Sequence, residues 1–165
     1  MKKLLIFFFL FSALQSQAQI DKIKIGDSMP AFTFTNENGE VIDSKTLKNK
    51  VVLINFFATW CGPCLAELPF LQQSVWEKYK DNQNFVLLVI GRGHTLQEVK
   101  AFKIKKKFTF AFHPDKDKQI YNLFATQYIP RNYLINQNGK VIYTSMGFEE
   151  NEFEAMLSKI KSIIK

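Results

Sequence analysis

An apolar run that leads straight into a pair of cysteines constrains the fold of this chain more than any other feature. The run, Val51 to Phe57 (VVLINFF), is rich in β-branched residues and has the length of a strand buried on both faces. After Cys61 to Cys64 (CGPC), apolar residues recur at steps of three and four, which predicts a helix beginning at this motif. These residues are Leu65, Leu68, Leu71, Val75 and Tyr79. A second buried strand, Phe85 to Ile90, follows, so strand, helix and strand alternate.

The rest of the chain continues this alternation and predicts a single α/β domain with a mixed sheet. Two turn signals, Asn38-Gly39 and Asn138-Gly139, each stand between short strand-like runs and predict hairpins. The other expected elements are strands over Ala31–Thr35 and Val41–Asp43, a helix capped by Thr95, a strand over Thr109–Phe112, a helix over Asp117–Phe124, strands over Asn132–Asn136 and Lys140–Met146, and a closing helix over Glu149–Ile164.

Residues 1–18 are predicted to form a secretory signal peptide. Two lysines precede an apolar run from Leu4 to Leu14, and small residues follow at Ser16 and Ala18. This pattern is typical of an exported chain that is cleaved after Ala18. An uncleaved anchor is the alternative, but about 20 apolar residues are needed to span a bilayer and this run is shorter. We therefore expect a periplasmic or otherwise exported domain over residues 19–165.

The formal charge of +7 does not indicate a nucleic-acid partner. The densest basic cluster, Lys103 to Lys107, contains no arginine, and the only arginines of the chain are Arg92 and Arg131. A solvated lysine-rich surface accounts for such a cluster. We expect no nucleic acid among the partners.

The spacing of the two cysteines favours redox chemistry, because they are three positions apart at a predicted helix start. Cys61 would lie at the helix N-terminus, where unpaired N–H groups and the helix dipole lower a thiol pKa from about 8.5 toward about 7. Pro63 suits the first helical turn, because its missing N–H would have no partner there. Cys64 would point further into the protein, which suits a resolving cysteine.

Other uses of this motif fit the sequence less well. A metal site would need His94 and His113 as further ligands, and their spacing fits no usual zinc site. Covalent haem attachment needs a histidine directly after the second cysteine, where Leu65 stands. A purely structural disulfide would close a very short loop and stabilise little. We expect no metal and no cofactor, with His94 capping or bordering a helix and His113 either in a turn or packed.

The segment VLINFFATWCGPCLAELP, Val52 to Pro69, resembles the active-site segment of the thioredoxin superfamily. It is most similar to the exported TlpA/ResA-like thiol–disulfide oxidoreductases, and the likeness includes Ile25 to Phe34 and Tyr128 to Lys140. The resemblance implies a thioredoxin-like three-layer fold with a central mixed sheet and an N-terminal β-hairpin extension. It also implies an inserted helix–strand segment near Thr95 to Phe112.

The resemblance also implies a substrate-binding surface around the cysteines. Pro130 matches the proline that is cis in thioredoxin folds, and the exposed backbone of Ile129 would then pair with an extended substrate strand. A trans proline in a surface turn is the alternative. Trp60, Gly62 and Pro63 would complete the surface.

Two departures from ordinary thioredoxins concern proton transfer. Asn55 stands where those proteins hold a buried Asp, which removes one candidate proton acceptor. Glu67, three residues after Cys64, matches an acidic residue of the exported subfamily and would exchange a proton with Cys64. The alternative is a favourable charge in the first turn of the helix. The candidate catalytic set is Cys61, Cys64 and Glu67.

The predicted function is an exported thiol–disulfide oxidoreductase that acts on proteins, and the Gly-Pro dipeptide resembles that of reducing thioredoxins. Its expected partners are disulfide-containing exported proteins and a membrane-associated electron donor, and it is expected to be a monomer. A thiol peroxidase of the AhpC/TSA type is one alternative. Its Thr and Pro, three and seven residues before the reactive Cys, are replaced here by Ala58 and Ile54. A chaperone-like binding module is another alternative, with Met146 and Met156 too isolated to suggest copper.

Overall fold

The computed structural model describes residues 20–164. The signal peptide predicted for residues 1–18, with its cut after Ala18, lies outside them. The strands are β1 (Thr33–Thr35), β2 (Val41–Asp43), β3 (Val51–Phe57), β4 (Phe85–Arg92), β5 (Phe112–Asp115), β6 (Arg131–Ile135) and β7 (Val141–Met146). The helices are η1 (Ser44–Leu47), α1 (Gly62–Phe70), η2 (Leu71–Trp76), α2 (Glu77–Tyr79), α3 (Leu96–Lys106), α4 (Tyr121–Phe124) and α5 (Glu150–Ile163).

Five strands form the central sheet in the order β5-β4-β3-β6-β7. β3 lies in the middle, parallel to β4 and antiparallel to β6, so the predicted mixed sheet is confirmed. Every residue of β3 is buried, which explains why all its residues except Asn55 are apolar. Its register places Asn55 directly opposite Asn132 of β6.

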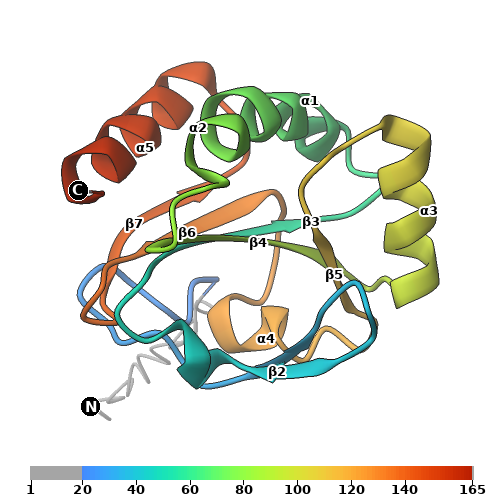
Figure 1. Ribbon diagram of the computed structural model, residues 1–165, viewed down its shortest axis with the longest axis horizontal. Helices are drawn as coiled ribbons and strands as arrows, with labels where there is room; N and C mark the ends of the chain where they lie inside the picture. Colours follow the sequence, from blue (N-terminus) through green and yellow to red (C-terminus); the bar gives the residue numbers. More distant parts are fainter. Residues whose placement is uncertain (1–19, 165) are drawn as a thin grey trace, which may run out of the picture.

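Two apolar clusters cover the two faces of the sheet, which gives the expected three layers (Figure 1). Leu53 and Phe57 of β3 face the cluster that holds residues of α1, α3 and α5. Ile54 and Phe56 face the other cluster, to which β1, η1 and α4 contribute. β1 and β2 form the separate N-terminal hairpin, which was predicted.

Several elements differ from the sequence-based expectation, and three of the differences have a cause in the structure. β5 begins at Phe112 rather than Thr109, because its pairing with β4 starts at Val89 opposite Phe112. α4 begins only at Tyr121, because the Asp115 carboxylate accepts the N–H groups of residues 120 and 121 and holds the preceding segment in a turn. The long helix after the cysteines passes through a π-helical segment, η2, which begins two residues after Pro69, a residue with no N–H to donate.

The predicted cap of α3 is confirmed. Thr95 accepts the backbone N–H of Glu98, and the Glu98 carboxylate accepts the backbone N–H of Thr95, so the two form a capping box. Within residues 20–164 no helix has the length and apolar character that crossing a bilayer requires.

Candidate active site

The two cysteines are joined by a disulfide at the start of α1. Cys61 is the N-cap residue, and its Sγ accepts the backbone N–H of Cys64 at 3.2 Å. Cys61 is 6% exposed and Cys64 is fully buried. The sulfur nearer the surface is therefore the one at which a helix N-terminus stabilises negative charge.

The loop before β6 lies beside this disulfide. The Ile129–Pro130 peptide bond is cis, so the trans alternative is wrong. The carbonyl oxygen of Ile129 lies 3.7 Å from Cys61 Sγ. Around the sulfur, Gly62 and Pro63 are exposed and Trp60 is 69% exposed. The site thus combines a reachable sulfur, an apolar surface and a nearby backbone edge.

Glu67 is 1% exposed and lies on the buried side of α1, as Cys64 does. Its two carboxylate oxygens accept hydrogen bonds from two amides, Asn132 Nδ2 at 2.6 Å and Asn55 Nδ2 at 2.8 Å. Asn55 also donates to Asn132 Oδ1 at 2.8 Å, so α1, β3 and β6 each supply one member of the cluster. Glu67 lies beyond the first turn of α1, which contains no acidic residue, so the alternative of a favourable charge in that turn is wrong.

Burial raises the pKa of Glu67 to about 7, although the hydrogen bonds from Asn132 and Asn55 act to lower it. The carboxyl therefore changes its protonation state close to neutral pH. Asn132 donates a further hydrogen bond to Ser145 Oγ at 3.1 Å. A void that is too small for a water molecule lies beside α5 and is lined by Glu67, Asn132, Ser145 and Glu152, among other residues.

His94 borders α3, as expected, and it also lies in the surroundings of the site, although the sequence analysis left it out of the catalytic set. Its Nε2 accepts the backbone N–H of Thr59 at 3.1 Å, two residues before Cys61, and its ring stacks on Phe57 at 6.2 Å. Burial lowers the pKa of His94, which favours the neutral ring that this hydrogen bond requires. One signal for the position of His94 was available in the sequence. Parallel strands end at the same edge of a sheet, so the loop after β4, which holds His94, begins beside the loop after β3, which leads to Cys61.

Gly91 makes room for His94. A Cβ on this glycine would lie 2.7 Å from a methyl group of Val99 and 3.1 Å from the Cβ of His94. The loop can therefore pack directly on β4 only with glycine at this position. His113, by contrast, packs away from the cysteines, with its Nδ1 3.0 Å from the carbonyl oxygen of Thr35.

Two further observations concern the described residues away from the cysteines. Within the described residues, no three His, Cys, Asp or Glu side chains are grouped so that they could hold a metal ion. A pocket of about 420 Å³ lies at the opposite end of β3, beside Lys45, Lys48 and Asn138, far along the sheet from the cysteines.

Comparisons with known proteins agree with this geometry. Residues 24–164 match the family model described as Redoxin. The thiol-disulfide oxidoreductase ResA of Bacillus cereus is 32% identical over 144 residues, which cover 87% of this chain and 82% of that protein. ResA of Bacillus subtilis is 28% identical over 145 residues, which cover 88% and 78%.

Solved structures show the same likeness. The solution structure of a proposed protein disulfide isomerase from Bacteroides thetaiotaomicron superposes with a TM-score of 0.84 at 32% identity, covering 88% of this chain and 93% of that chain. A thioredoxin family thiol:disulfide interchange protein from Chlorobium tepidum TLS superposes with a TM-score of 0.67 at 22% identity, covering 82% and 97%.

Proposed function

We propose that this chain reduces disulfide bonds in exported proteins. The premise is that it belongs to the Redoxin family and is a ResA-like thiol–disulfide oxidoreductase of the thioredoxin superfamily. The observation that carries the proposal is the position of Cys61. Its sulfur lies at the N-terminus of α1 and 3.7 Å from the carbonyl oxygen of Ile129. A substrate strand that pairs with Ile129 would bring its own disulfide to this sulfur.

The reaction we propose has two exchange steps. The Cys61 thiolate attacks one sulfur of the substrate disulfide, a mixed disulfide forms, and the other substrate sulfur leaves as a thiolate. The Cys64 thiolate then attacks Cys61 Sγ, the protein disulfide closes, and the second substrate sulfur leaves. The substrate gains two electrons and the protein loses two, so an external donor must afterwards reduce the Cys61–Cys64 bond.

Glu67 is proposed to take the proton of Cys64 in the second step. Cys64 is fully buried, and burial disfavours the charged thiolate. The thiol therefore needs a nearby base that removes its proton as it attacks. Glu67 lies on the same buried side of α1, and its pKa of about 7 lets it accept a proton and release it again near neutral pH. In the described residues its carboxylate is held by two amides rather than by a sulfur.

The proposed location is outside the cytoplasm, after cleavage behind Ala18. The support is the basic, apolar and small-residue pattern of residues 1–18. The partners we propose are disulfide-containing exported proteins and a membrane-associated electron donor, with the protein acting as a monomer. The peroxidase and binding-module alternatives are not favoured, because the related proteins of known activity carry out thiol–disulfide exchange.

A reduction potential tests the direction of the reaction. The protein is equilibrated with dithiothreitol buffers, and its disulfide content is measured by thiol trapping. A value near the roughly −270 mV of thioredoxin supports a reductase, whereas a value near the roughly −120 mV of a strong oxidant contradicts it. Peroxide consumption, measured with dithiothreitol as the electron donor, should stay at the level of a Cys61→Ser control.

A further inference from the structure

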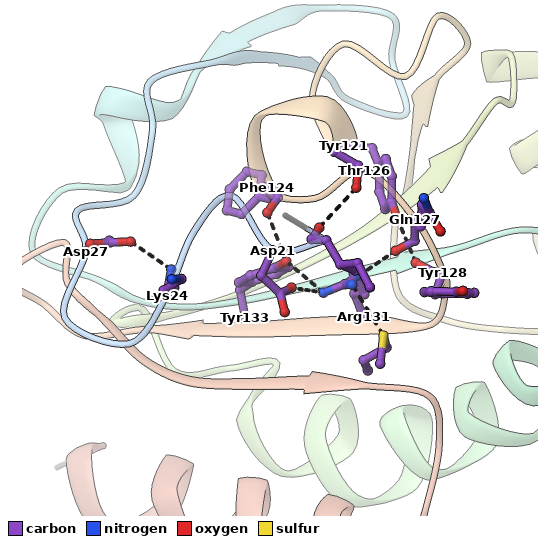
Figure 2. A network of polar contacts seen from close by, with 12 residues as sticks. Asp21, Lys24, Asp27, Tyr121, Phe124, Thr126, Gln127, Tyr128, Arg131 and Tyr133 are labelled. Atoms are coloured by element: carbon purple, nitrogen blue, oxygen red, sulfur yellow. Dashed lines mark hydrogen bonds and ion pairs between the residues drawn. The ribbon is translucent and has the colours of Figure 1, made fainter. Parts of the chain in front are cut away.

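The first residues that the structure describes, Ile20 to Ile23, form an arm along the segment that leads into the cis-proline loop (Figure 2). The carbonyl oxygen of Ile20 accepts the N–H of Thr126 at 3.0 Å. The carbonyl oxygen of Phe124 accepts the N–H groups of Lys22 and Ile23 at 2.9 and 3.2 Å. The arm is therefore fixed to the backbone only a few residues before Ile129.

Arg131, directly after the cis-proline, joins this arm to the loop. Its side chain is 2% exposed, and its Nη1 forms an ion pair with the carboxylate of Asp21, which is 45% exposed (Figure 2). Its Nε donates to the carbonyl oxygen of Gln127 at 2.9 Å, and its Nη2 contacts Met146 Sδ at 3.3 Å. Among residues 20–164, Asp21 is the carboxylate that pairs with this cation. A buried guanidinium depends on such a partner, because burial removes its hydration.

The loop itself depends on side-chain support. Tyr128 has a φ of +67°, a left-handed conformation that large residues rarely adopt unless their surroundings impose it. The carbonyl oxygens of Gln127 and Tyr128 accept hydrogen bonds from Arg131 Nε and from Tyr121 Oη, the latter at 2.7 Å. The Ile129 oxygen, in contrast, faces Cys61 Sγ. The contacts from Arg131 and Tyr121 therefore hold the carbonyl groups that precede Ile129, while the Ile129 carbonyl faces the disulfide.

We propose that Asp21 and Arg131 are positioning residues for substrate binding: their ion pair couples the N-terminal arm to the cis-proline loop and keeps the Ile129 backbone aligned for an extended substrate strand. The inference rests on the proposed function, because it requires a substrate that pairs with this edge. A small disulfide that reaches Cys61 without pairing depends on the arm far less than a disulfide within a peptide does.

The test compares two substrates on the full chain. One is a synthetic peptide with an extended segment on each side of its disulfide, and the other is bis(2-hydroxyethyl) disulfide. For Asp21→Asn we expect the KM for the peptide to rise about tenfold at similar kcat, the scale of losing one charge-assisted contact. The KM for the small disulfide should change much less. Hydrogen exchange at residues 127–129 should become faster.

A matched control removes a carboxylate from the same segment and leaves the ion pair intact. Asp27 follows the arm in sequence, and its carboxylate accepts the backbone N–H of Lys24 at 2.8 Å rather than contacting Arg131 (Figure 2). Asp27→Asn should therefore behave as the wild type with both substrates. Asp21→Glu, which keeps the charge, should recover most of the affinity for the peptide.

A further variant separates positioning from stability. Asp21→Asn combined with Arg131→Gln removes the unpaired buried cation, so the urea midpoint should rise above that of Asp21→Asn alone, while the KM for the peptide should stay high. If the double variant recovers both the urea midpoint and the KM for the peptide, the ion pair is merely structural and the inference is overturned. The inference would also be overturned if Asp21→Asn raised the KM equally for both substrates, or if folded Asp21→Asn kept the wild-type KM for the peptide. A wild type that reduces only the small disulfide would refute the proposed function, and this inference with it.

Discussion

Replacing Glu67 by Gln should remove a titration near neutral pH from the stability of the protein and from its rate of disulfide exchange. Folding raises the pKa of this carboxyl from 4.5 to about 7, mainly through burial. Between these two values the folded state binds more protons than the unfolded state, so stability falls as the pH rises. The contribution is fully present below about pH 4.5 and is lost as the pH passes about 7, and it amounts to about 3 kcal/mol.

Two measurements on the same proteins test this prediction. Urea unfolding of the oxidised protein across this pH range should show the loss of about 3 kcal/mol in wild type relative to Glu67→Gln. Stopped-flow reduction of a disulfide substrate, from about pH 5 to about pH 9, should show a different pH dependence in the variant, which keeps the titration of the Cys61 thiol but loses that of the Glu67 carboxyl. Glu154→Gln is the matched control, because Glu154 is exposed on α5, and its profiles should follow the wild type.

Each measurement can refute a different part of the reasoning. If the unfolding free energies of wild type and Glu67→Gln stay parallel across this range, the buried carboxyl does not titrate there, and the argument from burial is wrong. If the stabilities diverge while the rate profiles superimpose, Glu67 titrates but takes no part in proton transfer. The catalytic set would then contract to Cys61 and Cys64.

Three further predictions follow from the same site. Cys64→Ser should trap mixed disulfides with substrate proteins on non-reducing gels and Cys61→Ser should not, because only the buried thiol resolves the intermediate; equal trapping contradicts this order. His94→Leu should lower the free energy of unfolding by about 1–3 kcal/mol, because it leaves the N–H of Thr59 without an acceptor, while His94→Gln should lose less in the same urea titration. Gly91→Ala should cost about 1–3 kcal/mol, because the added Cβ would lie 2.7 Å from a valine methyl group of α3; a wild-type urea midpoint would contradict this.

The elements around the disulfide could be predicted from the sequence because their signals are local. A mainly apolar run rich in β-branched residues predicts a buried strand, and a CGPC motif followed by apolar residues at helical spacing predicts the helix that Cys61 caps. The hairpin turn at Asn138-Gly139 and the capping box of Thr95 and Glu98 likewise depend on a few adjacent residues. The proline at position 130 was placed by resemblance to a family rather than by any local pattern.

The environment of Glu67 was decided by the tertiary structure. The sequence made this residue a candidate, but its protonation depends on burial and on two amides that are 12 and 65 positions away. Only the register between β3 and β6 sets Asn55 opposite Asn132 and turns both toward the carboxylate. His94 and the Asp21–Arg131 pair, which spans 110 positions, depend on tertiary structure in the same way. Local patterns determine which segments become strands and helices, whereas charge, burial and hydrogen bonding at a site depend on which of these segments pack together.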